Sequence, residues 1–246
     1  MAKARASTKS AAPKRLPRGR HALAPEEVLR DQRERLIDAV PSVVAERGYE
    51  AMSVADIVKA AAVSRNAFYK NFADKQECFA AAHDAGHERL FEVLVQSCDS
   101  EATIEDRVEG SLAAALGALA SDPDTARLLF VEAPSAGEGI ALQYHRWLQH
   151  YGTLLRMAAP DLPAQSIPAP EVEGVIVGGI ASRVASEVLH GRAAKLRELT
   201  ASLVEYVLAF YRIVEPGPKE GKLVTFEREQ HQAQEPVEAQ RKQASA

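Results

Sequence analysis

The residues best suited to molecular recognition are clustered in the stretch from Ser64 to Lys75. If residues 64–72 are helical, one face presents guanidinium, amide, methyl, phenol and ammonium groups, from Arg65, Asn66, Ala67, Tyr69 and Lys70. Arginine can donate two hydrogen bonds to guanine, asparagine can pair with adenine, and alanine can meet a thymine methyl in the major groove. Tyr69, Lys70 and Lys75 suit phosphate contacts. The pattern predicts a helix that reads DNA, against the plainer alternative that these side chains simply face water.

Two short helical segments, residues 53–61 and 64–72, are needed to hold this face in place. The residues between them, Ala62 and Val63, leave room only for a sharp turn. The pair is therefore predicted to form a helix-turn-helix.

Caps and anchors support this prediction. Ser53 with Asp56 resembles a capping box on the first segment, and Ser64 is the expected N-cap of the second. Phe68 and Phe72 are expected to anchor the second helix against the core, because three turns of helix are too few to be stable alone.

The charge of the chain is unevenly distributed along its 246 residues. Residues 1–75 carry 15 Lys and Arg against 9 Asp and Glu, a balance of +6, whereas residues 76–246 carry 15 against 25, a balance of −10. The two values sum to the net charge of −4. The N-terminal part is therefore expected to attract polyanions and the remainder to repel them.

Both ends of the chain are polar and are predicted to be disordered. Residues 1–21 are basic with no acidic residue, and they form either a solvated or cloning-derived tail or an arm that touches DNA. Residues 215–246 are rich in Gln, Glu and Pro and are expected to be disordered or loosely helical.

Between these tails the apolar residues recur every three or four positions, with no sustained alternation of period two. The fold class is therefore predicted to be all-α. Prolines from Pro160 to Pro170 mark a linker, after which two long helices are expected at about 171–190 and 195–213.

Residues 33–82 resemble the N-terminal DNA-binding domain of TetR-family transcriptional regulators. The matching positions are Gly48-Tyr49, Ser53-Val54, Ile57, Ala61, Val63-Ser64, Phe68-Tyr69, Phe72, and Lys75 with Glu77. Three positions depart from the family pattern: Ala62 replaces a turn glycine, Asn71 replaces a frequent histidine, and Pro41 lies inside the first helix, which it should kink or break. Carried over residue by residue, the resemblance implies DNA contacts from Ser53, Ser64 and Asn71 as well as the residues above.

The resemblance also implies a domain order and a dimer. Residues 22–80 would form the helix-turn-helix domain, and residues 81–214 an effector-binding and dimerisation domain. The last two helices of each subunit would form a four-helix bundle through Val172, Ile176, Gly179, Ile180, Leu203, Val207 and Phe210. The alternative is a monomer whose own core buries these apolar faces. In a dimer, two recognition helices would read a pseudo-palindromic operator.

A pocket for a small-molecule effector is expected between about residues 83 and 157. The candidate contacts are Phe91, Arg127, Tyr144, Trp147 and Tyr151, a mixture that also occurs in any helical core. His83 and His87 could present two imidazoles to a metal, but no third ligand is identifiable, so a structural or solvated pair is favoured. No metal or cofactor is therefore predicted.

The function that these patterns favour is a homodimeric DNA-binding transcriptional regulator, most readily a repressor that an effector releases. The alternative is a helical protein-interaction module whose basic end binds an acidic partner. Nothing in the sequence supports an enzyme, because it has no GxSxG motif, no Cys/His nucleophile arrangement and no supported carboxylate pair. With no long apolar run and no signal peptide, the protein is expected to be cytoplasmic and not a membrane partner, with Cys78 and Cys98 as buried thiols.

Overall fold

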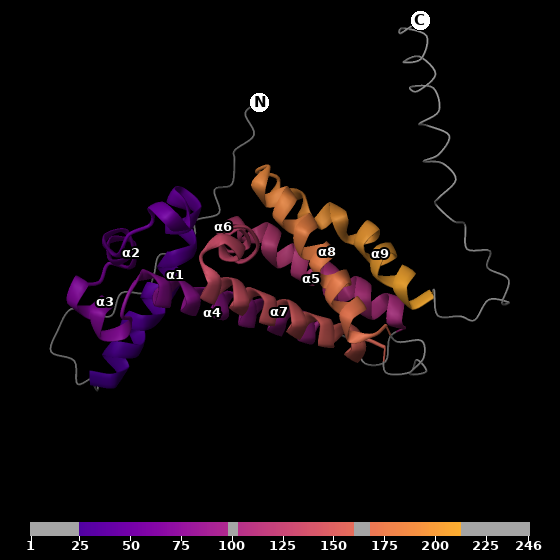
Figure 1. Ribbon diagram of the computed structural model, residues 1–246, viewed down its shortest axis with the longest axis horizontal. Coiled ribbons are helices and arrows are strands. Elements are labelled where there is room, and N and C mark those ends of the chain that lie inside the picture. Colours follow the sequence, from indigo (N-terminus) through magenta and orange to yellow (C-terminus); the bar gives the residue numbers. More distant parts are fainter. Residues whose placement is uncertain (1–24, 98–102, 160–167, 213–246) are drawn as a thin grey trace, which may run out of the picture.

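The computed structural model describes residues 25–97, 103–159 and 168–212, and every regular element in these ranges is helical (Figure 1). The elements are α1 (Pro25–Ala51), α2 (Val54–Ala61), α3 (Arg65–Asn71), α4 (Lys75–Gln96), α5 (Ile104–Ser121), α6 (Pro123–Arg127), the π-helix η1 (Leu128–Glu132), the 3₁₀ helix η2 (Ala133–Ser135), α7 (Glu138–Met157), α8 (Pro170–Leu189), the 3₁₀ helix η4 (Ala193–Leu199) and α9 (Thr200–Arg212). The prediction of an all-α fold is confirmed. The tails predicted over 1–21 and 215–246 lie outside the described residues, as do Cys98 and most of the proline-rich linker.

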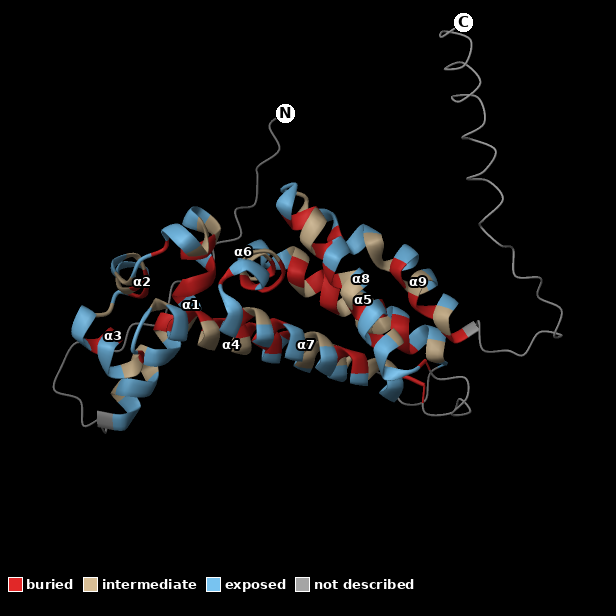
Figure 2. Cartoon of the chain, viewed as in Figure 1, coloured by how far each residue is buried: buried red, intermediate tan, exposed pale blue. Residues whose placement is uncertain are grey.

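The helices divide the molecule along its length. The small helices α2 and α3 lie beside α1 at one end, α4 leads away from them, and α8 and α9 lie toward the other end (Figure 1). Buried residues line the facing sides of the helices, and exposed residues lie on the outer sides (Figure 2). One apolar core runs from α1 through α4, α5, α7 and α8, so the end that carries α3 is packed continuously onto the rest of the chain.

The first helix is bent at Gly48 and is not broken at Pro41. Gly48 has φ 75° and ψ 162°, whereas α1 continues through Pro41, whose side chain is buried. Proline in a helix interior costs about 3 kcal/mol. Leu36 and Val40, both 0% exposed, flank it in the core and contribute burial energy of similar size. Of the two expected effects of Pro41, a kink or a break, the break does not occur, because core packing offsets the cost of the proline.

The turn between α2 and α3 adopts the geometry that usually needs glycine. Ala62 has φ 52° and ψ 43°, and it is the one described residue other than glycine with a positive φ. The guanidinium of Arg35 on α1 donates to the carbonyls of Ala61 and Ala62, the latter at 2.7 Å. The turn therefore tolerates a Cβ because α1 holds both of its free carbonyls.

Replacing Ala62 with glycine is expected to stabilise the protein by about 0.5–1 kcal/mol. The left-handed conformation costs an L-residue about 1–2 kcal/mol, and the greater flexibility of unfolded glycine offsets part of that gain. The measurement is the denaturant midpoint. The matched control is Ala60→Gly at an exposed position within α2, which is expected to lower stability by about 1 kcal/mol. Equal effects of the two changes would contradict a strained turn.

Candidate functional site

The recognition helix α3 is only seven residues long, and its neighbours fix its orientation. The hydroxyl of Ser64 accepts a hydrogen bond from the Ala67 N–H at 3.0 Å, which confirms Ser64 as the N-cap. Phe68 and Phe72 are buried, and the guanidinium of Arg33 lies 4.4 Å from the centre of the Phe72 ring. The underside of α3 is thus anchored in the core while its other side remains open.

The open side of α3 carries Arg65, Asn66, Tyr69 and Lys70, all of which are exposed. Tyr69 is 50% exposed, and its hydroxyl lies 3.4 Å from a guanidinium nitrogen of Arg65. These groups are free to meet a duplex, and their contacts with bases and phosphates remain predictions. Ala67 does not share this face, because it is only 6% exposed and lies where α3 packs on the core. The prediction that Ala67 lies on the exposed face is therefore wrong, and its contact with a thymine methyl stays untested.

Ser53 and Asn71 flank this open face. Ser53 is the exposed N-cap of α2 and forms the predicted capping box with Asp56. The Asn71 amide donates to the Ala67 carbonyl at 2.8 Å, so its nitrogen is engaged within α3. DNA contacts from either residue stay predictions.

Lys75 is placed differently from its prediction. Its ammonium donates to the carbonyls of Tyr49, Glu50 and Met52 at 3.0–3.1 Å and lies 4.8 Å from the centre of the Tyr49 ring. An ammonium has three N–H groups, and all three are used within the chain. Lys75 therefore fastens the first residue of α4 to the end of α1 and to Met52, and its predicted contact with a phosphate stays a prediction.

A cavity of about 390 Å³ lies between α4, α5, α7 and α8. Its lining is mostly aliphatic and includes Leu90, Leu116, Phe130, Ile180 and Val184. The polar groups of the lining come from Arg107, Ser111 and Tyr151. The Arg107 guanidinium donates to the carbonyl of Ala158 at 3.0 Å. The cavity can hold a molecule of drug-like size that is largely apolar.

Of the five predicted effector contacts, only Tyr151 lines this cavity. The Trp147 indole is stacked on the imidazole of His87, with ring centres 5.3 Å apart, and Phe91 lies against Trp147, with ring centres 6.4 Å apart. The indole N–H of Trp147 donates to Asp84 at 2.8 Å. Tyr144 is buried near His83, and Arg127 forms an ion pair with Glu132 at 2.8 Å. These four residues contribute to the core and its polar contacts instead of the cavity wall.

His83 and His87 form a buried polar chain beside the cavity. Their Nε2 atoms are 3.1 Å apart, and His87 Nδ1 lies 2.7 Å from the Tyr151 hydroxyl. Burial lowers the pKa of His83 to about 4 and the pKa of His87 to about 2, so both rings are neutral at pH 7. No group of three His, Cys, Asp or Glu residues that could hold a metal occurs within the described ranges. Cys78 is buried too, which raises the pKa of its thiol to about 12.

The predicted dimer residues fall on both sides of the last two helices. Ile176, Leu203 and Val207 are buried within the chain itself, and Ile180 and Val207 line the cavity. These four therefore belong to the core, because the strongest apolar stripe faces inward. Gly179 admits the hydroxyl of Tyr206, which a Cβ would displace. The large apolar side chains exposed on α8 are Val175, at 62%, and Leu189, at 60%.

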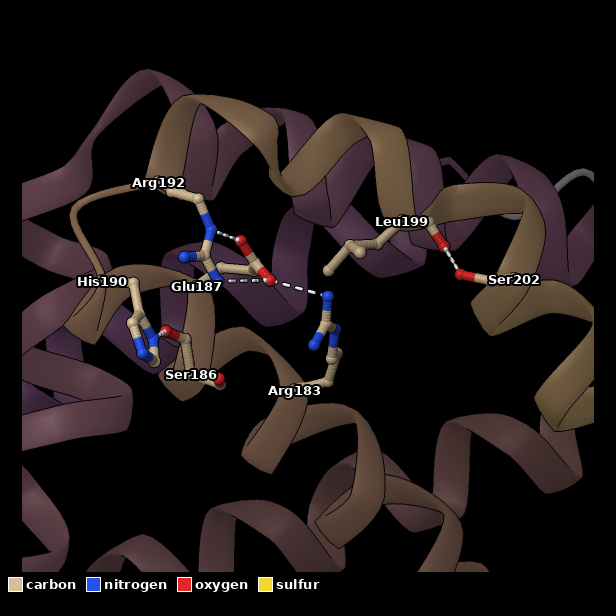
Figure 3. Close-up of polar contacts among 7 residues, drawn as sticks. All are labelled: Arg183, Ser186, Glu187, His190, Arg192, Leu199 and Ser202. Atoms are coloured by element: carbon tan, nitrogen blue, oxygen red, sulfur yellow. Dashed lines mark hydrogen bonds and ion pairs between the residues drawn. The ribbon is translucent and has the colours of Figure 1, made fainter.

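The C-terminal end of α8 is fixed by a buried carboxylate (Figure 3). Glu187 accepts from Arg192 Nε at 2.6 Å and pairs with Arg183 at 2.7 Å, and the bond from Arg192 lowers the pKa of Glu187. This arrangement positions η4, where the predicted last helix begins as a 3₁₀ segment. Arg197 on η4 donates to the Gly117 carbonyl at 2.9 Å, which ties η4 to α5.

No helix in the described part of the chain is long and apolar enough to cross a membrane. Residues 36–82 match the family model described as bacterial regulatory proteins, tetR family. The comparison with curated protein sequences gave no match.

Solved structures share the fold over most of their length. The transcriptional regulator FadR from Bacillus subtilis, solved in complex with stearoyl-CoA, is 18% identical with a TM-score of 0.63, over 72% of this chain and 98% of that one. FadR from Bacillus halodurans is 21% identical with a TM-score of 0.64, over 72% and 94%. A TetR regulator from Chloroflexus aurantiacus is 14% identical with a TM-score of 0.59, over 74% and 96%. Residues 36–82, which contain the helix-turn-helix, therefore match the model of bacterial regulatory proteins of the tetR family, and the described helices share the all-α fold of these solved regulators.

Proposed function

We propose that this protein is a homodimeric repressor that binds a pseudo-palindromic operator and leaves it when a small apolar effector fills the core cavity. The observation that carries the proposal is the two-sided character of α3. Its underside is anchored by Phe68 and Phe72, while Arg65, Asn66 and Tyr69 are presented outward with no other part of the described chain covering them. Such a helix can enter a major groove without unpacking.

The cavity supports an effector with a long aliphatic part. Its wall is built mainly from Leu, Val, Ile and Ala side chains. Burial of methylene groups against such a wall is favourable, and the wall offers few hydrogen bonds. The FadR structure that shares this fold was solved with stearoyl-CoA. An acyl chain would fit the character of the wall, with the more polar end of the molecule near Arg107 or Ser111.

The dimer is proposed to form through the outer face of α8 and α9. Val175 and Leu189 place exposed apolar surface on α8. The small exposed side chains of Ala201 and Ala209 on α9 would let a partner helix approach closely. Two-fold symmetry would set two copies of α3 about one duplex turn apart. By linkage, DNA and effector then weaken each other's binding by the same factor.

The experiment that tests this proposal is selection of bound fragments from the genome of the source organism, followed by titration of the recovered duplex. Binding should be at least 10³-fold tighter than binding to random duplex at about 150 mM salt. Equal affinity for both would favour the alternative, a helical interaction module with an acidic partner. Addition of stearoyl-CoA to the complex then tests the effector class.

Arg65→Ala is expected to relax base preference at one position of each half-site and to cost about 1–3 kcal/mol of operator binding. The guanidinium is exposed on α3 near Tyr69, so its loss leaves the packing of the helix unchanged. Selection with the variant followed by sequencing measures the change. Equal loss on operator and random DNA would mean that Arg65 does not contact a base.

A further inference from the structure

A short joint to α2, residues 48–52, is formed by the last turn of α1 after the bend at Gly48 together with Met52, and two side chains from elsewhere in the chain hold it. The ammonium of Lys75 donates hydrogen bonds to three carbonyls of the joint, those of Tyr49, Glu50 and Met52. The Tyr49 N–H, at the start of the joint, donates a hydrogen bond of 3.0 Å to the carboxylate of Glu132, which lies 83 residues later in the sequence. An anion at the start of this turn and a cation at its end both suit the dipole of a helical turn. Two side chains from outside the joint therefore hold its backbone, in addition to the packing of α2 and α3 on α1.

Glu132 itself is rigidly held. Its other carboxylate oxygen pairs with Arg127 at 2.8 Å, and its side chain is only 13% exposed. Gly48 suits the bend beside this carboxylate because of its φ of 75°, whereas a Cβ there would make only an ordinary contact with Glu132, at 3.5 Å. The bond from the Tyr49 N–H to this carboxylate is charge-assisted and has an ordinary length of 3.0 Å.

The element that carries Glu132 also forms part of the cavity wall. Glu132 is the last residue of η1, and Phe130, two residues earlier in the same turn, lines the cavity. The Phe130 ring meets the His87 ring edge-on at 5.8 Å, and Leu129 packs closely on Gly86 of α4. A π-helical turn is rare and commonly occurs at functional sites. Here one turn touches the cavity with one side chain and the joint with another.

We propose that Glu132 is the positioning residue that links occupancy of the cavity to the placement of the helix-turn-helix. A ligand that displaces Phe130 moves the turn it belongs to, and with it the carboxylate that holds the Tyr49 N–H. The joint then keeps the bonds from Lys75 and the packing of Tyr49 on Phe79, and the placement of α2 and α3 shifts relative to η1. This link acts beside the continuous connection through α4. It rests on the proposed function, because it needs a cavity whose filling changes DNA binding.

The link can be tested without a known effector, by filling the cavity with a side chain. Ala115→Phe places a ring in the cavity from α5, and Glu132→Ala removes the anchor at the joint. Each single change is expected to weaken operator binding by about 10-fold, and the double variant by little more than either alone. Glu132→Gln keeps an acceptor and should restore most of the affinity. The matched control, Glu138→Ala, removes an exposed carboxylate and should leave the response to Ala115→Phe intact.

An additive loss of about 100-fold in the double variant would overturn the proposal, and so would full affinity in Glu132→Ala. If Ala115→Phe fails to fold, judged by thermal unfolding, Leu116→Trp fills the same cavity. Amide hydrogen exchange gives a readout that does not depend on DNA. Filling the cavity should speed exchange of the Tyr49 N–H while that of α5 stays unchanged, and an unchanged Tyr49 N–H would refute the link. If the two substitutions are coupled but stearoyl-CoA does not release the protein from the operator, the proposed effector class is contradicted and the link through Glu132 is not.

Discussion

Acidification from pH 7 to pH 5 is expected to lower the free energy of unfolding by about 4 kcal/mol through His83 and His87 alone. Burial lowers the pKa of His83 to about 4 and that of His87 to about 2, with the neighbouring imidazole as a further cause for His87. Both rings lie near Tyr144, and His87 also lies against Trp147 and Tyr151, in surroundings where a charged imidazole would lose its hydration.

The sign follows from proton uptake. An unfolded histidine titrates near 6.5, so between that pH and the folded pKa the unfolded chain binds more protons than the folded chain. Stability is therefore full above about 6.5 and falls as the pH drops, by about 1.4 kcal/mol per pH unit for each ring. At pH 5 each ring has cost about 2 kcal/mol. Asp84, which hydrogen-bonds Trp147, opposes this shift for His83 and does not cancel it.

Denaturant titrations at several pH values measure this loss. Replacing His83 or His87 with glutamine should remove about half of the acid-dependent loss, although each variant starts from a lower stability at pH 7. His145→Gln, at an exposed site on α7, is the matched control and should keep the wild-type profile. A wild-type profile in both buried variants would show that other groups cause the acid sensitivity.

The helix-turn-helix could be predicted almost completely from the sequence, because its signals are local. Ser64 caps α3 as expected, and Phe68 and Phe72 are buried as the apolar spacing requires. The sequence pattern places Ala67 on the outer face of α3, and this is wrong. Ala67 is the third residue of the helix, and its side chain is buried. The break expected at Pro41 also does not occur, because the packing of Leu36 and Val40 outweighs the intrinsic cost of proline.

The effector cavity could not be predicted, because a cavity is defined by what the core leaves unfilled. Leu116 and Val184 look like any buried aliphatic residues in sequence, and only the arrangement of α4, α5, α7 and α8 sets them around open space. The aromatic and polar residues that the sequence suggested as effector contacts instead interact with other side chains. Trp147 donates a hydrogen bond to Asp84, and Arg127 forms an ion pair with Glu132. The same limit applies to α8 and α9, where an apolar stripe does not say which partner covers it.

Lys75→Met is expected to weaken binding to all DNA sequences by about 10- to 100-fold and to lower the free energy of unfolding by about 2–4 kcal/mol. The methionine keeps most of the side-chain volume but leaves the carbonyls of Tyr49, Glu50 and Met52 without their donor. The joint then loosens, and α3 is presented in many orientations, most of them unable to enter the groove. Because no phosphate contact is lost, the dependence of affinity on salt should keep its slope.

Lys70→Met is the matched comparison, since Lys70 is exposed on α3 beside the residues that face DNA. Its loss should leave stability unchanged and reduce the salt slope by about 0.9, the contribution of one neutralised phosphate. Titrations at several salt concentrations, run with denaturant unfolding of the same samples, separate the two roles. The internal role of Lys75 would be refuted by a variant that unfolds like the wild type and loses one unit of salt slope, because that is the behaviour of a lysine on a phosphate. The expected results would mean that Lys75 supports DNA binding by holding the joint in place, whereas Lys70 supports it by neutralising a phosphate of the duplex.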